Sequence, residues 1–458
     1  MFIDHNYIYD ILEKTKKVTD ERIEKVLTAA ETKRNLTIEE VATLLNITKE
    51  EHLQKLLEIA GKIKNDIYGN RLVIFAPLYV SNYCVNNCTY CGYKRTNKFP
   101  RKKLTREEIQ KEVMLLEKSG HKRIALEAGE DPANCSIDYI LDAIDAVYTT
   151  KNENGAIRRI NVNIAATTVD NYKKLKKAEI GTYILFQETY HKPTYEKMHP
   201  KSIKGDYKYH LTAFDRAMEA GIDDVGGGVL FGLADYKFEV LSLMLHNQHL
   251  EEKYGVGFHT ISVPRLKKAD GMSLEQFPHL VDDKTFIKLT AILRLAVPFT
   301  GMILSTRESQ KIRKLLIKYG VSQISAGSCT DVGGYAEKAE GKHTPQFELA
   351  DHREPIDILK ELIKDKHIPS YCTACYRSGR TGDRFMRLAK SGQIHNVCTP
   401  NALMTLMEFI TDYGDNEIYE KGYSLIQEEI LKIDNQKIKE LTKNNIERIK
   451  NGERDLFV

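Results

Sequence analysis

Six of the eight cysteines in this 458-residue chain fall into two groups, and each group has a spacing that suits metal binding. The groups are Cys84, Cys88 and Cys91, spaced CxxxCxxC, and Cys372, Cys375 and Cys398, of which the first two form CxxC. In a reducing compartment such clustered thiols indicate metal ligands rather than disulfides. Each group offers three thiolates, whereas a tetrahedral zinc site or a fully ligated 4Fe-4S cluster takes four ligands.

The first group directly follows an apolar run that predicts a strand, and Tyr90 precedes its last cysteine. Three thiolates leave one iron of a 4Fe-4S cubane without a protein ligand, and such an iron can bind a small molecule. Ligand number and location favour this interpretation over a structural zinc site completed by a distant histidine, or three unrelated buried thiols. We therefore predict an open 4Fe-4S cluster on this loop.

The second group lies near the carboxyl end, where Cys398 comes just before a helix predicted to begin at Pro400. CxxC is an effective metal clasp because its two thiolates converge on one ion or cluster. A zinc site with His395 or His367 as the fourth ligand is one interpretation. A second three-thiolate cubane, which needs no histidine, is the other.

The elements that must position these thiols are predicted by the spacing of apolar residues. The first 70 residues have helical spacing, with a capping pattern at "TIEEVATLL". Short β-branched runs then alternate with amphipathic helices, which is typical of βα units around a parallel sheet. Eight runs begin near Arg71, Arg123, Ile160, Tyr183, Asp224, Phe258, Met302 and Gln323. They predict an α/β fold, a closed or slightly opened (βα)8 TIM-type barrel.

The alternation stops after about residue 330, and helices are expected at 355–366, 378–391, 400–412 and 420–448. We therefore expect an N-terminal helical extension over 1–70, a barrel over 71–345 and a C-terminal helical domain over 346–458 that carries the second cysteine group. The first group then lies at the C-terminal mouth of the barrel, where active sites of this fold are built.

Polar residues end several strands and would face this mouth. Gly129 and Glu130 end the second strand, although an ordinary strand-to-loop glycine would look the same. The third and fourth strands are followed by Asn163, Thr167, Gln187, Glu188, Tyr190 and His191. A polar run after a buried strand is costly in a core but natural in a cofactor pocket.

Two further side chains could take part in chemistry. Arg307, with Ser305 nearby, ends the seventh strand, and its rigid fork suits the carboxylate of an amino-acid substrate. A plain surface ion pair is the competing interpretation. His259 lies beside the sixth strand, where a lone histidine is more often a core or surface residue than a metal ligand.

Composition limits the class of protein. Apolar residues make up 42% of the chain, enough for a sizeable core, and the 68 basic and 64 acidic residues leave a net charge of only +4. We therefore expect no binding to nucleic acid or to an anionic membrane. The amino terminus lacks the apolar run of a signal peptide, and no window suits a membrane span, so a cytoplasmic location is expected.

The CxxxCxxC loop, with Tyr90 before its last cysteine, resembles the radical S-adenosylmethionine (radical SAM) superfamily. This resemblance implies that the open iron chelates SAM and splits it to a 5'-deoxyadenosyl radical. Gly129 and Glu130 resemble the GGE motif that approaches SAM, with Ala128 in place of its first glycine. Tyr90, Asn163 and Glu188 are expected near SAM as well.

Nearly the whole chain resembles the radical SAM tyrosine lyases that mature FeFe-hydrogenase. The shared segments are the cysteine loop, "FQETYHKPTYEKMHP", "HTISVPRL", "STRES", "SAGSCTDVGGY" and the CxxC tail. The resemblance implies that L-tyrosine is cleaved at Cα–Cβ to p-cresol and dehydroglycine, which then gives carbon monoxide and cyanide at an auxiliary 4Fe-4S cluster with an extra iron. Arg307 and Ser305 match the substrate site.

The resemblance also assigns the tail. Cys372, Cys375 and Cys398 match the auxiliary ligands, His259 matches the extra-iron ligand, and a bound free cysteine would bridge cluster and iron. The implied partners are a one-electron donor such as ferredoxin or flavodoxin and other hydrogenase maturation proteins. Because dehydroglycine must travel between the clusters, we expect a tunnel along the barrel, with the tail covering the end opposite the cysteine loop.

Other functions remain open from the sequence. One is a tyrosine lyase of the thiazole-biosynthesis type (2-iminoacetate synthase), which shares the barrel motifs but lacks the cysteine-bearing tail. Another is a sulfur-donating radical SAM enzyme whose tail cluster is consumed. A third, from a different class, is an iron-sulfur scaffold or carrier protein.

Overall fold

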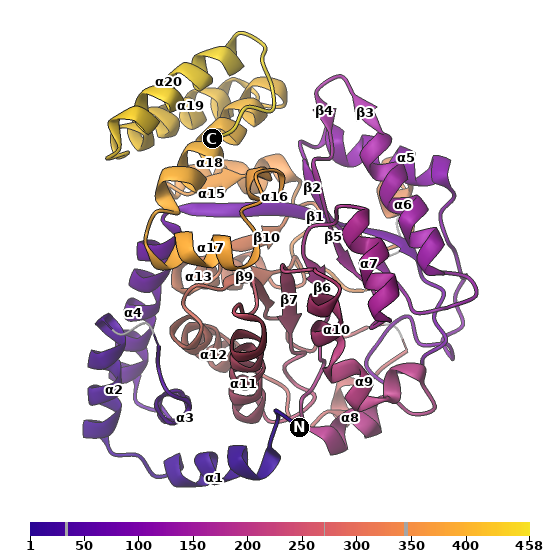
Figure 1. Ribbon diagram of the computed structural model, residues 1–458, viewed down its shortest axis with the longest axis vertical. Coiled ribbons are helices and arrows are strands. Elements are labelled where there is room, and N and C mark those ends of the chain that lie inside the picture. Colours follow the sequence, from indigo (N-terminus) through magenta and orange to yellow (C-terminus); the bar gives the residue numbers. More distant parts are fainter. Residues whose placement is uncertain (33–34, 270, 343–346) are drawn as a thin grey trace.

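The computed structural model describes residues 1–458 except 33–34, 270 and 343–346. At its centre a parallel sheet closes on itself, because β1 (Arg71–Ser81) pairs with both β2 (Arg123–Ala128) and β10 (Gln323–Ser325). Figure 1 shows these strands surrounded by helices. The prediction of a closed (βα)8 TIM-type barrel is confirmed.

Every predicted barrel strand is present within two residues of its expected start. The other barrel strands are β5 (Arg159–Asn163), β6 (Tyr183–Ile184), β7 (Val225–Gly228), β8 (Thr260–Ser262) and β9 (Gly301–Leu304). In β7 the glycines have a packing reason, since a Cβ on Gly227 would lie 2.7 Å from the ring of Phe258. Lys151–Asn152 (β3) and Gly155–Ala156 (β4) form a separate small hairpin.

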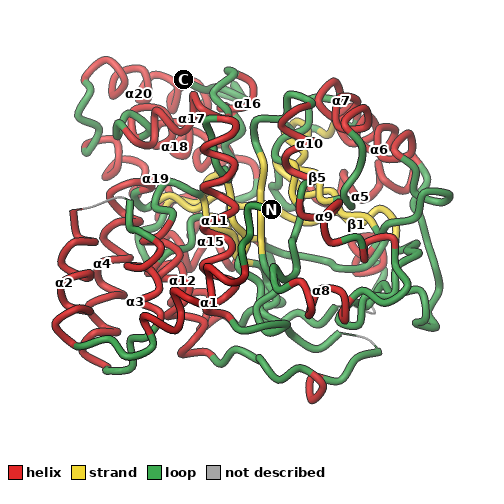
Figure 2. The backbone as a smooth tube through the Cα atoms, turned by 60° about the horizontal axis from the view of Figure 1, so that its bottom comes forward, coloured by secondary structure: helices red, strands yellow, loops and turns green. Residues whose placement is uncertain are grey.

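The helices that follow the barrel strands wrap the sheet, as the red tubes around the yellow strands show in Figure 2. A capping box of Thr105 and Glu108 starts the first of them. These helices are α5 (Arg106–Lys118), α6 (Ile137–Thr149), α7 (Val169–Lys177), α8 (Lys192–Met198), α9 (Tyr207–Leu211), α10 (Ala213–Glu219), α11 (Tyr236–Tyr254), α12 (Asp283–Ala296), α13 (Gln310–Tyr319) and α14 (Gly334–Ala339), with 3-10 turns η1 (Ile203–Gly205) and η2 (Leu274–Gln276).

The N-terminal residues are helical, as expected. They form α1 (His5–Thr15), α2 (Asp20–Thr32), α3 (Ile38–Leu45) and α4 (Glu50–Tyr68), drawn in indigo in Figure 1. The apolar face of α4 packs against α12 and α13, so this extension covers one flank of the barrel. In the described part of the chain, no helix combines the length and apolarity that crossing a membrane would require.

The C-terminal region joins the barrel through a strand that the sequence did not predict. Ile368–Ser370 (β11) runs parallel to β1, with Ile368 opposite Arg71. The CxxC segment follows immediately, so its position is tied to the sheet. The division of the chain at residues 70 and 345 stays a prediction, and β11 means that barrel and tail share one sheet.

The tail helices differ from expectation in two places. They are α15 (Pro355–Lys364), α16 (Ala374–Arg377), α17 (Gly382–Lys390), α18 (His395–Asp412), α19 (Asn416–Leu431) and α20 (Gln436–Lys450). The single helix expected over 420–448 is wrong, because Asn435 caps a separate α20. Cys398 lies inside α18 rather than before it, since that helix begins at His395 and contains Pro400.

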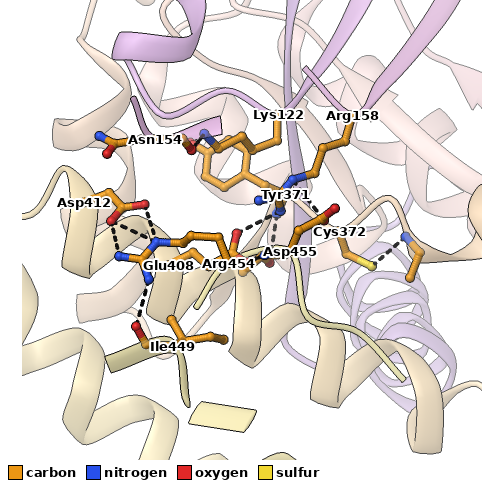
Figure 3. Close-up of polar contacts among 12 residues, drawn as sticks. Lys122, Asn154, Arg158, Tyr371, Cys372, Glu408, Asp412, Ile449, Arg454 and Asp455 are labelled. Atoms are coloured by element: carbon orange, nitrogen blue, oxygen red, sulfur yellow. Dashed lines mark hydrogen bonds and ion pairs between the residues drawn. The ribbon is translucent and has the colours of Figure 1, made fainter. Parts of the chain in front are cut away.

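Ion pairs fix the tail to the base of the barrel (Figure 3). Arg158, which precedes β5, pairs with Glu408 of α18 at 2.8 Å and with Asp455 at 3.0 Å. The side chains of Arg158 and Glu408 are 9% and 5% exposed, so removing one partner would leave the other charge buried. This contact holds α18, the helix that carries Cys398, against the barrel.

Candidate active site

The first cysteine group lies on a loop directly after β1, above the carboxyl ends of the barrel strands. Arg101 organises this loop by donating hydrogen bonds to the carbonyl oxygens of Asn82 at 2.6 Å and Tyr93 at 2.8 Å. Cys88 is buried, Cys84 and Cys91 are half-buried, and all three are free thiols.

Gly129 and Glu130, at the end of β2, support the loop from below. A Cβ on Gly129 would lie 2.3 Å from the carbonyl oxygen of Tyr83 and 3.3 Å from Cβ of Cys84, so only glycine fits. Glu130 accepts a hydrogen bond from Nδ2 of Asn86 at 2.5 Å. Both residues therefore contact the segment that carries the cysteines, and Glu130 does not line the neighbouring cavity.

A cavity of about 280 Å³ opens below the loop, and we call it the upper cavity. Six of the predicted site residues line it, namely Tyr90, Cys91, Asn163, Glu188, Ser305 and Arg307. They come from the loop after β1 and from the ends of β5, β6 and β9. Parallel strands bring these distant segments to one mouth, as the sequence pattern predicts.

Two carboxylates shape the polar side of the upper cavity. Glu188 adopts a left-handed backbone conformation, with φ of 66°, and its side chain forms a half-buried ion pair with Lys204 at 2.6 Å. Asn163 donates a hydrogen bond to Glu127 at 2.7 Å. Burial raises the pKa of Glu127 to about 8, although the bond from Asn163 acts in the opposite direction. Glu127 was not among the predicted site residues.

Arg307 lies at the opposite wall, and no described residue forms an ion pair with it. Its Nε is buried and has no hydrogen-bond partner among the described residues, and burial lowers the pKa of the guanidinium. The surface ion pair considered from the sequence is therefore not what the structure has. Ser305 lies beside it and its Oγ accepts a hydrogen bond from the amide of Arg307 at 3.4 Å.

Some residues expected at this mouth turn away from it. The hydroxyl of Tyr190 pairs with Nδ1 of His246 on α11 at 2.8 Å, and His191 contacts Thr194 at 2.8 Å. Thr167 and Gln187 do not line the cavity either. The chain leaves the barrel after Glu188, so the next side chains face the surrounding helices. The sequence could not predict the direction of that turn.

The second cysteine group lies at the other end of the barrel, around what we call the lower cavity. Cys372, Cys375 and Cys398 line it together with residues at the starts of strands, namely Arg71, Val73, Arg123, Asp224, His259 and Gln323. All barrel strands run in one direction, so their starts and ends mark opposite ends. The prediction that the tail covers the end opposite the cysteine loop is confirmed.

His259 lies in the lower cavity with the tail thiols. Its ring packs against Phe385 of α17 with centroids 4.4 Å apart, its Nδ1 lies 3.8 Å from Asp224, and burial lowers its pKa. The histidines considered as zinc ligands lie elsewhere: Nε2 of His395 is bonded to the carbonyl oxygen of Asp66, and His367 lines another cavity. In the described ranges no three metal-binding side chains are grouped as ligands of a single ion.

The lower cavity holds several buried polar atoms that lack hydrogen-bond partners among the described residues. They are Arg71 Nη2, Arg123 Nε, both carboxylate oxygens of Asp224, His259 Nδ1 and Thr373 Oγ1. Burying so many unpaired polar atoms is costly unless a ligand satisfies them. The sequence predicted only that strands begin at Arg71, Arg123 and Asp224. The one feature that could have indicated a site was a charged residue at the start of each apolar run.

Both ends of the barrel fit iron-sulfur clusters by the chemistry of their donors. Each end presents three free thiols on elements tied to the sheet, and burial raises the pKa of Cys91 and Cys375 to about 11. Such thiols remain protonated unless a cationic metal centre stabilises the thiolate. At the upper end, Gly129 packs closely against the cysteine loop and fixes its position directly beside the upper cavity.

Comparison with known proteins agrees with this geometry. The family model of the radical SAM superfamily matches residues 78–241, and that of the Biotin and Thiamin Synthesis associated domain matches residues 262–367. The 2-iminoacetate synthase of Salmonella typhimurium is 30% identical over 341 residues, which cover 74% of this chain and 87% of that protein.

Two solved structures are similar over almost the whole chain. A crystal structure of HydG, a maturase of the [FeFe]-hydrogenase, is 59% identical with a TM-score of 0.97 and covers 100% of both chains. HydG from Carboxydothermus hydrogenoformans is 38% identical with a TM-score of 0.85, covering 96% of this chain and 97% of that one. Members of the radical SAM superfamily bind SAM at a 4Fe-4S cluster. The chain therefore belongs to the HydG family of radical SAM lyases.

Proposed function

We propose that this protein cleaves L-tyrosine between Cα and Cβ to p-cresol and dehydroglycine, and converts dehydroglycine to carbon monoxide and cyanide for FeFe-hydrogenase assembly. One observation carries the proposal: two groups of three free cysteines lie at opposite ends of one closed barrel, each beside its own cavity. A lyase with a single reaction site would need only the upper group.

In this proposal Cys84, Cys88 and Cys91 hold the cluster that binds SAM, and the tail cysteines hold an auxiliary cluster. When bound, the first cluster and SAM supply a 5'-deoxyadenosyl radical, and the second supplies an iron site for small ligands. His259 is the proposed ligand of an extra iron in the lower cavity. The polar atoms around His259 that lack hydrogen-bond partners among the described residues are the proposed contacts of a free cysteine, which would be a further ligand.

The residues of the upper cavity bind and orient the substrates. We assign the carboxylate of tyrosine to Arg307, because its buried guanidinium has an unpaired N–H and a planar fork that matches a carboxylate. Ser305 lies beside it. Glu188, fixed by Lys204, and Asn163, fixed by Glu127, provide the polar contacts proposed for SAM.

The barrel interior is the proposed route between the two cavities. Along β2, Ala125 lines the upper cavity and Arg123 the lower one, and along β10 Ser325 and Gln323 do the same. Inward-facing alanine and serine leave space where larger side chains would fill the barrel. Enclosure by the barrel also keeps water from reactive intermediates.

The proposal extends to partners and location. Reductive cleavage of SAM needs a one-electron donor such as ferredoxin or flavodoxin, and the products pass to other hydrogenase maturation proteins. Six clustered, free cysteines are compatible with a reducing compartment, so we propose a cytoplasmic location.

The test uses the full chain, reconstituted anaerobically with iron and sulfide. With SAM, tyrosine and dithionite it should form 5'-deoxyadenosine and p-cresol, and infrared spectra should develop bands of carbon monoxide and cyanide. Failure to form p-cresol refutes the lyase proposal and supports a scaffold or carrier. Formation of p-cresol without the two diatomic products indicates a lyase of the 2-iminoacetate synthase type.

A further inference from the structure

The lower cavity contains a buried cation and a buried anion that do not satisfy each other. Nε of Arg123 and both oxygens of Asp224 lack hydrogen-bond partners among the described residues. The described residues give no ion pair between these two side chains, and Asp224 has only a long contact, 3.8 Å, to Nδ1 of His259. Both residues are less than 5% exposed. Two buried charges of opposite sign whose polar atoms lack hydrogen bonds are costly, and a small zwitterion would supply hydrogen bonds and a counter-charge to both.

Arg123 is placed where the barrel interior meets the lower cavity. Inward-facing residues alternate along β2, so Arg123 lies directly below Ala125 and Glu127, which line the upper cavity. A molecule that moves down the interior beside β2 therefore meets this guanidinium first. Asp224, immediately before β7, lies across the same cavity.

The guanidinium of Arg123 is held in position by the tail. Its Nη2 donates to the hydroxyl of Tyr376 at 2.8 Å, and that hydroxyl also contacts Thr182 of the barrel at 3.1 Å. Because Tyr376 directly follows Cys375, the same short helix places both a thiol and the partner of Arg123. Nε remains free to bind a ligand beside the tail cysteines.

We propose that Arg123 and Asp224 form a receiving site for dehydroglycine, with the carboxylate on Arg123 and the protonated imine nitrogen on Asp224. This inference rests on the proposed function. Dehydroglycine, H₂N⁺=CH–COO⁻, carries one charge of each sign, as the site requires. Its conversion to HCN, CO and H₂O balances without an oxidant or reductant.

Holding the intermediate here has a chemical purpose. Water attacks a free imine, and H₂N⁺=CH–COO⁻ plus H₂O gives glyoxylate and NH₄⁺. A charged, enclosed site beside the tail cysteines keeps dehydroglycine from this hydrolysis until it reacts. The ratio of glyoxylate to carbon monoxide therefore reports on how well the site retains the intermediate.

The experiment measures CO and glyoxylate, each per p-cresol formed, in the reconstituted full chain. Arg123→Met and Asp224→Asn should each lower CO per p-cresol roughly tenfold, the loss expected for one charge-assisted contact. Glyoxylate per p-cresol should rise by a matching amount, and Arg123→Lys should restore part of the CO. Glycine, a saturated zwitterion of similar shape, should raise the glyoxylate ratio of the wild-type protein.

Arg159→Met is the matched control. Its guanidinium stacks over the same Tyr376 ring at 4.0 Å, but it donates to the carbonyl oxygen of Glu179 and does not line the cavity. Its product ratios should equal those of the wild type, and altered ratios would indicate that moving Tyr376 suffices, which overturns the proposal.

Two further results would overturn it. Unchanged ratios in Arg123→Met and Asp224→Asn are the first. The second is loss of CO without added glyoxylate, which would mean that the pair holds a resident amino acid or the cluster itself. If either variant fails to load iron, glycine competition in the wild-type protein becomes the test of the site. An unchanged glyoxylate ratio in the presence of glycine would then refute the site. Failure of the proposed function is distinct, because the wild type would then form no p-cresol or no CO.

Discussion

A single methyl group at Gly129 should disable the first cysteine group. The Cβ of Gly129→Ala would lie 2.3 Å from the carbonyl oxygen of Tyr83, whereas carbon and oxygen atoms in contact are about 3.3 Å apart. The backbone before Cys84 must therefore move by roughly 1 Å. The clash is with backbone, so no side-chain rotation relieves it.

Two magnitudes follow from this displacement. Overpacking of this kind costs about 1–3 kcal/mol of folding free energy, which a barrel of this size tolerates. A misplacement of 1 Å at a reacting centre can lower a rate about 100-fold. We therefore expect Gly129→Ala to fold and to lose roughly two orders of magnitude in p-cresol formation.

The assay combines iron analysis, electron paramagnetic resonance of the reduced cluster with and without SAM, and the rate of p-cresol formation. Ala128→Gly is the control: it changes the neighbouring residue of the same strand, adds no atom and should retain cluster and rate. Full iron content together with an unchanged p-cresol rate in Gly129→Ala would refute the steric argument.

Three other predictions concern separate parts of the molecule. Cys372→Ala with Cys375→Ala should lower iron from about eight or nine per chain to about four and abolish CO while p-cresol still forms; equal loss of both products would contradict the division of labour. Arg307→Lys keeps the charge but loses the fork, so the KM for tyrosine should rise about tenfold, and an unchanged KM would argue against a carboxylate clamp. The raised pKa of Glu127, about 8 against an ordinary 4.5, means that the cofactor-free chain should lose stability relative to Glu127→Gln as pH rises between these values; parallel urea-unfolding profiles would count against it.

The barrel could be predicted from the sequence because its signals are local. Each strand is an apolar run next to a capped helix, and the closed sheet follows from repeating that unit. The tail could not be predicted equally well. Ile368–Ser370 is too short to be distinguished as a strand, and it exists because it pairs with β1, far away in the sequence.

The same distinction separates the site residues that were predicted from those that were not. The cysteine groups are local patterns, and Asn163, Glu188 and Arg307 follow strands directly. By contrast, Arg123 and Asp224 looked like ordinary strand starts. Their importance depends on strand register, which turns both side chains into one cavity, and on a tail that encloses it.

The lower cavity supports the proposal that the tail carries chemistry rather than only covering the barrel. The N-terminal end of a (βα)8 barrel normally serves stability, and active sites lie at the other mouth. Here that end instead contains buried polar atoms on Arg71, Arg123 and Asp224 that have no hydrogen-bond partner among the described residues, and a purely structural base would have paired them or replaced them by apolar residues. A cap that only sealed the barrel would gain nothing from leaving them unpaired. Their presence beside three free thiols is what the proposed second reaction site requires, because fixed charges there would bind the charged intermediate that we propose arrives through the barrel.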